Sequence, residues 1–191
     1  DILMDNGAPA GGKWNYDQSN RRRYDGKVPL PEIPAFDNDV SDIVAMIHRC
    51  RVPTFGRIDP KKLIWPVTRD QALRQLHAFV DHRLRHFGTY QDAMTAQTGF
   101  LFHSLLSFAL NTKMLHPLEV IQAAIDRGGP NSGEPAGIEQ LEGFARQILG
   151  WREYMRGIYW AHMPAYASMN HFGHRTGLPG FYWSGDTRMN C

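Results

Sequence analysis

The stretch QILGWREYMRGIYW over residues 147–160 has a clear helical pattern. Together with the residues before it, this stretch places one apolar residue after another on a single helical face, namely Leu141, Phe144, Ile148, Met155 and Tyr159. We therefore predict a long helix that turns this face to the core and ends near the proline at position 164.

Arg152 lies on the same face, between Ile148 and Met155. Because a guanidinium keeps its charge, a buried arginine needs acceptors that match it. Large aromatic residues stand nearby at positions 151, 154 and 160. The helix is therefore expected either to direct Arg152 at a flat, polar ligand or to pair it with a neighbouring Asp or Glu in an ordinary core.

A second segment reads FHSLLSFALN over residues 102–111 and begins with two serines three residues apart. Hydroxyl groups and free backbone N–H groups at a helix start can receive a phosphate. Ser104 and Ser107 are therefore candidate phosphate ligands, with simple helix capping as the alternative.

The SLLS sequence at 104–107 and the WREY sequence at 151–154 together resemble the flavin-binding domain of the photolyase/cryptochrome superfamily. In that family a Ser-x-Leu-Ser turn holds the FAD diphosphate, and a Trp-Arg-acidic-aromatic helix lines the cofactor and lesion pocket. Three further segments, GGKWNYD at 11–17, FGTYQDAM at 87–94 and MNC at 189–191, resemble the bacterial (6-4) photolyases that carry an iron–sulfur cluster.

The resemblance implies an all-α fold. Residues 38–191 would form the first part of a helical FAD-binding domain, and residues 1–37 a linker between domains, rich in Gly and Pro. It also implies that the chain is an internal piece of a longer protein. An α/β antenna domain would precede it, and a further helical part with the remaining cluster cysteines would follow.

The implied activity is light-driven DNA repair. Excited reduced FAD would donate an electron to a (6-4) pyrimidine photoproduct flipped out of the duplex. The implied cofactors are FAD, a 4Fe–4S cluster to which Cys191 gives one thiolate, Mg²⁺, and an antenna chromophore in the preceding domain. UV-damaged DNA would be the partner, the protein a monomer, and the 191 residues alone inactive.

The resemblance also assigns roles to single residues. Those implied to contact FAD are His103, Ser104, Leu106, Ser107, Gln147 and Arg152. Those implied to act in catalysis are Asp92, Trp151, Arg152 and Trp183, the last as a one-electron relay. Those implied to contact DNA are Lys13, Trp14, Tyr16, Asp17, Arg21 and Arg22.

Two of these assignments can also be considered from the residues alone, without the resemblance. The cations and aromatics over residues 13–24 suit contact with phosphates combined with stacking on bases. The alternative is a solvated loop whose aromatics pack on the domain. Asp92 is either the cap of a following helix or a carboxylate that holds the lesion base or a divalent cation.

Further helices are expected over residues 39–51, 68–87 and 117–128. The first has an inner face of Val40, Ile43, Val44 and Ile47, with Cys50 as a structural residue at its end. The second is expected to begin with a capping box of Thr68 and Gln71 and to stop at Gly88. Its charged outer face comprises Arg69, Arg74, Arg83 and Arg85. Trp65, Phe108 and Leu110 are expected in the core.

Composition sets the remaining bounds. With 42% hydrophobic residues, the 191-residue chain suits one globular domain, and its net charge of +2 permits contact with nucleic acid without requiring it. Two cysteines are too few for a disulfide framework, which favours a reducing, cytoplasmic setting. No apolar run is long enough to span a bilayer. Two rival functions stay open: a photoreceptor of the same family, and a cofactor-free helical interaction module.

Overall fold

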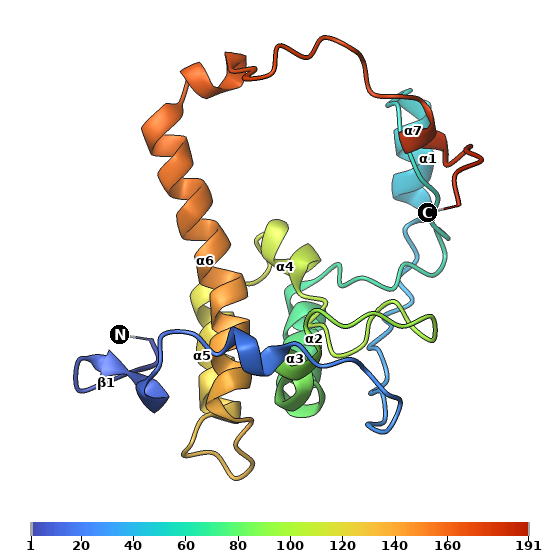
Figure 1. Ribbon diagram of the computed structural model, residues 1–191. Helices are drawn as coiled ribbons and strands as arrows, with labels where there is room; N and C mark the ends of the chain where they lie inside the picture. Colours follow the sequence, from blue (N-terminus) through green and yellow to red (C-terminus); the bar gives the residue numbers. More distant parts are fainter. Residues whose placement is uncertain (1, 191) are drawn as a thin grey trace.

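The computed structural model describes residues 2–190 and is mostly helical (Figure 1). Its helices are α1 (Ser41–Arg49), α2 (Arg69–His82), α3 (Leu84–Tyr90), α4 (Ser107–Asn111), α5 (Pro117–Gly128), α6 (Ile138–His162) and α7 (Phe181–Ser184). Short 3-10 turns are η1 (Ala10–Gly12), η2 (Asp17–Asn20) and η3 (Ala165–Ser168). The strands β1 (Met4–Asp5) and β2 (Ala8–Pro9) form a small antiparallel hairpin that the sequence did not predict.

The core lies where α2, α3, α5 and the first half of α6 meet. Three phenylalanines from three helices form its centre: Phe79 lies 4.6 Å from Phe144, and Phe87 lies 5.3 Å from Phe144, measured between ring centroids. α5 matches its prediction, because Pro117 opens it, His116 and Glu119 cap it and Gly128 is its last residue.

The predicted helix over residues 68–87 is two helices. Its start is confirmed, since the hydroxyl of Thr68 accepts a hydrogen bond from the amide of Gln71 at 3.2 Å. The side chain of Gln71 does not complete a capping box, because it bonds to Val67 and Asn38 instead. The break falls at Arg83, between α2 and α3.

Gly88 does not stop the helix as predicted, because α3 continues to Tyr90. A Cβ atom at Gly88 would lie 2.9 Å from the carbonyl oxygen of Glu139 on α6. The glycine therefore allows a close approach of α3 and α6.

The long helix α6 is confirmed, including its end before Pro164. Its inner face is only partly as predicted: Leu141, Phe144 and Ile148 are buried, whereas Met155 is 60% exposed and Tyr159 55% exposed. Figure 1 shows the reason, because the second half of α6 projects beyond the helices that cover its first half.

The outlying helices also differ from expectation. α1 lies apart from the core (Figure 1), and Ile43 of its predicted inner face is 52% exposed. Cys50, predicted to be structural, is an exposed free thiol. Trp65 is half-buried and stacks on Phe108 at 6.3 Å instead of entering the core. Phe108, also expected in the core, is partly exposed, whereas Leu110 is buried there as predicted.

The segment before α1 packs on the helices. Asn20 is fully buried between α3 and α6, and Tyr24 is buried against Leu101 and Phe102. The aromatic Trp14, by contrast, is largely exposed. In the described part of the chain, no helix combines the length and the apolar character needed to cross a membrane.

Candidate functional site

A hollow of about 380 Å³ lies between α3, the segment after it, the start of α4 and α6. Its lining includes six of the residues predicted for the cofactor or for catalysis, namely Asp92, His103, Ser104, Leu106, Ser107 and Gln147. Apolar side chains of Phe87, Leu105, Phe144 and Ile148 complete the wall, together with Gln91. Its volume is in the range of small-molecule sites, about 300–1,000 Å³.

The segment before α4 presents its backbone to this hollow. Leu105 has a φ of 58°, which is uncommon for a leucine, and its carbonyl oxygen accepts a hydrogen bond of 2.9 Å from the buried Gln75. The hydroxyl of Ser104 accepts a hydrogen bond from the amide of Leu106 at 3.4 Å. Ser107 is the exposed first residue of α4. The turn therefore presents a hydroxyl and the first free N–H groups of a helix.

His103 lies half-buried at the edge of the same turn. Burial and the nearby Arg83 guanidinium lower the pKa of His103 below its ordinary value, and Asp92 acts in the opposite direction. At neutral pH the imidazole is therefore neutral and can both donate and accept a hydrogen bond.

Arg83 was predicted on the charged outer face of its helix, and this prediction is wrong. Its side chain is buried, with only 2% of the residue exposed. Its guanidinium donates to the carbonyl oxygens of His103 at 3.1 Å, Pro31 at 3.2 Å and Glu32 at 3.0 Å. It has no carboxylate partner among residues 2–190. Burial lowers the pKa of Arg83 from its ordinary value, yet an arginine stays charged at neutral pH. Arg83 thus joins two distant segments beside the hollow.

Asp92 is exposed at the rim of the hollow. It does not cap a following helix, because the next helix along the chain is α4, which begins at Ser107. Its carboxylate is therefore available to a ligand.

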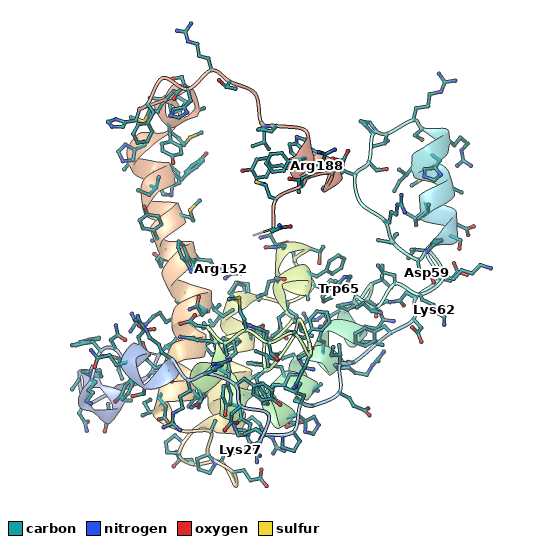
Figure 2. All side chains as sticks on the ribbon, turned by 45° about the vertical axis from the view of Figure 1, so that its right-hand side comes forward. Lys27, Asp59, Lys62, Trp65, Arg152 and Arg188 are labelled. Atoms are coloured by element: carbon teal, nitrogen blue, oxygen red, sulfur yellow. The ribbon has the colours of Figure 1, made fainter. Side chains whose placement is uncertain are left out.

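The other predicted catalytic residues lie outside the hollow. Arg152 donates a hydrogen bond of 2.8 Å to the carbonyl oxygen of Ile148, so neither the expected carboxylate partner nor a pocket contact is seen among the described residues. Figure 2 shows it on α6 just beyond the packed side chains. Trp151 lines a second hollow of about 520 Å³ with Arg146, Gln147 and Tyr154. Trp183 belongs to α7, which Figure 1 shows apart from α3, α4 and α6, and its ring centroid lies 5.7 Å from that of Phe55.

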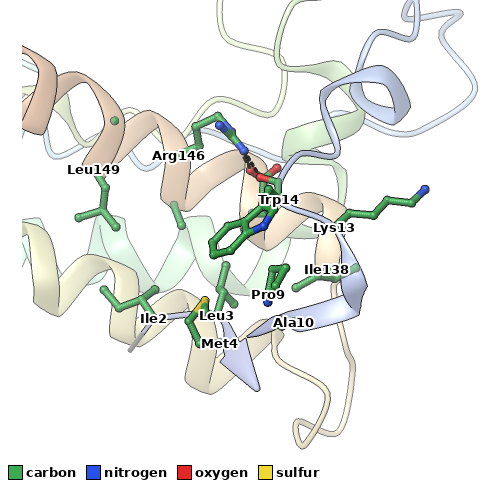
Figure 3. Close-up of a pocket in the computed structure, with 13 residues that line it drawn as sticks. Ile2, Leu3, Met4, Pro9, Ala10, Lys13, Trp14, Ile138, Arg146 and Leu149 are labelled. Atoms are coloured by element: carbon green, nitrogen blue, oxygen red, sulfur yellow. Dashed lines mark hydrogen bonds and ion pairs between the residues drawn. The ribbon is translucent and has the colours of Figure 1, made fainter. Parts of the chain in front are cut away.

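The predicted DNA contacts form an exposed surface along the first half of α6. Trp14 covers a third hollow of about 300 Å³ above the hairpin, and Lys13 points away from it (Figure 3). Arg146 donates to the carbonyl oxygen of Trp14 and pairs with Glu142. Asp17 pairs with Arg21, Tyr16 is half-buried, and Arg22 is exposed. The surface combines cations with an exposed indole.

The predicted cluster ligand Cys191 lies outside the described residues. Within residues 2–190, no three His, Cys, Asp or Glu side chains come together in a group that could hold a metal ion. His171 and His174 are exposed.

Sequence reasoning missed five residues that line the hollow, namely Phe87, Gln91, Leu105, Phe144 and Ile148. Gln91 is adjacent to Asp92 in the quoted segment, and its buried Oε1 has no hydrogen-bond partner in the described part of the chain. Phe144 and Ile148 were expected only as core residues, but both also form the wall. Periodicity marks a side chain as inward-facing, and it does not distinguish a core from a pocket wall.

Comparison with known proteins identifies relatives of this chain. Residues 1–63 match the sequence model of the family described as deoxyribodipyrimidine photo-lyase-related protein. The whole chain is 42% identical over 192 aligned residues to a (6-4) photolyase of Agrobacterium fabrum, and it covers 37% of that protein. An uncharacterised protein of Acanthamoeba polyphaga mimivirus is 31% identical over 98 residues, which are 51% of this chain and 73% of the viral protein.

The chain therefore spans little more than a third of the bacterial relative that it matches from end to end. The alignment with this relative covers the whole chain, and a family model matches residues 1–63. The chain belongs to the deoxyribodipyrimidine photolyase-related family.

Proposed function

We propose that this protein takes part in light-driven repair of UV-damaged DNA, with a (6-4) pyrimidine photoproduct as the substrate and FAD as the cofactor. The observation that carries the proposal is the hollow beside α4. It collects six of the predicted site residues from three separate segments, Gln91–Asp92, His103–Ser107 and Gln147. The similarity to the Agrobacterium (6-4) photolyase supports the same reaction.

The residues of the hollow suit the chemical parts of FAD. Ser104, Ser107 and the free N–H groups at the start of α4 would hold the diphosphate. Phe87, Phe144 and Ile148 would pack against the flat ring system, and Gln147 and the neutral His103 would bond to its polar edge. Bound FAD would supply the light-driven electron donation to the lesion.

The chain itself would bind, orient and shield the reactants. Asp92 at the rim would hold the extruded base or a Mg²⁺ ion, and extrusion costs least for a damaged base. Lys13, Trp14, Tyr16, Asp17, Arg21 and Arg22 would contact the DNA. Their cations would meet phosphates and the exposed indole would stack on a base.

Four assignments have less support from the arrangement and stay predictions. Trp151 and Arg152 would reach the ligand only from the exposed half of α6. Trp183 as a relay would act from α7, outside the hollow. The iron–sulfur cluster would need ligands that residues 2–190 do not bring together, so no step of the proposed reaction is assigned to it.

The proposal is tested by counting bound flavin in the full-length protein. Replacing Ser104 and Ser107 together by alanine is expected to reduce the FAD released on denaturation at least about tenfold, because charge-assisted phosphate contacts contribute about 1.5–3 kcal/mol each. The matched control replaces Ser168 and Ser184, two exposed serines of which Ser184 also accepts a hydrogen bond from an amide two residues on. Unchanged flavin in the first variant would contradict the proposed cradle.

A further inference from the structure

The crossing of α3 and α6 encloses one polar side chain from a distant part of the chain. Asn20, the last residue of η2, is fully buried there. Its Nδ2 donates a hydrogen bond of 2.9 Å to the carbonyl oxygen of Glu139 in the first turn of α6. Its immediate neighbours in sequence, Ser19 and Arg21, are exposed. A single side chain of this exposed turn thus enters the helical packing.

Two glycines make the space that Asn20 occupies. A Cβ atom at Gly88 of α3 would lie 2.9 Å from Asn20 Nδ2, and one at Gly143 of α6 would lie 3.0 Å from the same atom. Any larger residue at either position would meet the amide. Both helices are therefore shaped at the crossing to admit Asn20.

Two backbone bonds fix the same turn on either side of Asn20. The amide of Tyr16 donates to the carboxylate of Glu142 on α6 at 3.3 Å. The amide of Arg22 donates to the carbonyl oxygen of Thr89 on α3 at 3.2 Å. Asn20 lies between these bonds and is the only side chain of residues 17–22 that is buried.

The turn held in this way presents Asp17 and Arg21, which pair with each other at the surface. An exposed ion pair of this kind contributes little to stability, so Arg21 can exchange its partner for a phosphate at small cost. Burial of an amide side chain costs free energy compared with burial of an apolar side chain. Its hydrogen bond, however, is satisfied in only one orientation, so a buried amide fixes the position of the turn that carries it.

We propose that Asn20 is a positioning residue that sets the place of the Asp17–Arg22 turn for its contact with the damaged DNA strand. The inference rests on the proposed function for the DNA contact, and it names the residue that orders that contact. The same crossing also touches the candidate flavin site, because Gly143 lies beside Gln91 Oε1, where its Cβ atom would be 3.4 Å away. Asn20 nevertheless does not line the hollow.

The first test uses neither flavin nor DNA. Trypsin cleaves after Arg21, Arg22 and Arg23, which are exposed in the turn and directly after it. Asn20→Ala in the full-length protein is expected to speed native-state cleavage at these sites about tenfold, because the turn opens more often without its anchor. Gln18→Ala, an exposed residue of the same turn, is the matched control and should leave the rate unchanged. Equal cleavage rates for wild type and Asn20→Ala would overturn the inference.

A second variant reaches the same anchor from the helix side. Gly143→Ala is expected to displace the Asn20 amide and to speed cleavage as Asn20→Ala does. Gly150→Ala, in the same helix but with only Arg146 Cγ near the added atom, at 3.8 Å, should not. If Gly143→Ala leaves the cleavage rate at the wild-type value, the Asn20 side chain is not held between α3 and α6 as described.

The third measurement distinguishes a specific loss of DNA binding from a general disturbance of the fold. Asn20→Ala is expected to bind DNA containing a (6-4) photoproduct about tenfold more weakly at fixed salt, while its FAD content stays at the wild-type value. Parallel loss of FAD and DNA binding would show a general core position and overturn the positioning role. Faster cleavage in a protein that never binds flavin would leave the anchor standing and remove the proposed repair function instead.

Discussion

The two halves of α6 have similar apolar periodicity and opposite surroundings. From Leu141 to Ile148 the apolar face packs against α3 and α5, whereas from Trp151 to Trp160 the large side chains are exposed. Helical period depends only on the local sequence, but burial depends on a second element that faces the helix. The comparison shows that an apolar stripe predicts a helix more securely than it predicts a core.

Removal of one aromatic ring from each half of α6 should give the largest difference in the free energy of unfolding. Phe144→Ala is expected to lower the free energy of unfolding by about 3–5 kcal/mol, because the ring lies fully buried against Phe79 and Phe87. Tyr159→Ala should change it by less than about 0.5 kcal/mol. Urea unfolding of both variants checks this, and equal losses would show that the second half is also packed.

A buried and an exposed arginine make the next comparison. Arg83→Met leaves the carbonyl oxygens of Pro31, Glu32 and His103 without their donor and should cost about 2–4 kcal/mol at about 1 kcal/mol for each lost bond. Arg156→Met, on the exposed half of α6, should cost less than about 0.5 kcal/mol because its ion pair with Glu153 is at the surface. Thermal unfolding distinguishes the two, and a harmless Arg83→Met would remove its structural role.

Glycine replacement sharpens the same contrast with a smaller effect. Gly157→Ala has open space around the added methyl group and should stabilise the second half of α6 by about 0.5–1 kcal/mol, since alanine is the better helix former. Amide hydrogen exchange near the end of α6 measures this as slower opening. Faster exchange would indicate that the glycine is needed there for close packing.

The smallest expected effect is on pH dependence. The pKa of His103 is lowered in the folded protein, so the unfolded chain binds more protons below the ordinary histidine value of 6.5. Stability is therefore full above that pH and falls as the pH drops from about 6.5 through the folded pKa. His103→Gln should flatten the slope between pH 7.5 and 5.5 in urea unfolding, and His171→Gln, at an exposed position, should not.

Removal of the Arg83 charge also tests the electrostatics of the candidate site, separately from the stability of the fold. Arg83→Met should raise the pKa of His103, because one of the two causes that lower it disappears and Asp92 remains. An NMR titration of the imidazole measures the change. A pKa that stays in place would show that burial alone sets it.

Sequence reasoning recovered the helices with strong local signals. Pro117 and Gly128 bound α5, Thr68 caps α2, and Pro164 follows the end of α6, because caps and prolines act within one turn. It also assembled six residues of the candidate site, on the basis of resemblance. The structure independently brings those six residues into one hollow.

What the sequence could not show was fixed by partners distant along the chain. Arg83 stands among other arginines, and only carbonyl oxygens from two remote segments distinguish it as buried. Asn20 occurs in a stretch dense in Gly, Pro and polar residues, and its burial depends on glycines at positions 88 and 143. Met155 and Tyr159 were expected to be buried because the local sequence does not record whether another element faces them, and within residues 2–190 both side chains are exposed.

The central claim is that the hollow between α3, α4 and α6 binds a flavin. The most direct measurement is the visible absorption spectrum of the full-length protein as purified. Structured flavin bands in the blue are expected, and they should weaken in the Ser104→Ala, Ser107→Ala double variant. A spectrum with only the aromatic ultraviolet band, unchanged after incubation with FAD, would contradict it.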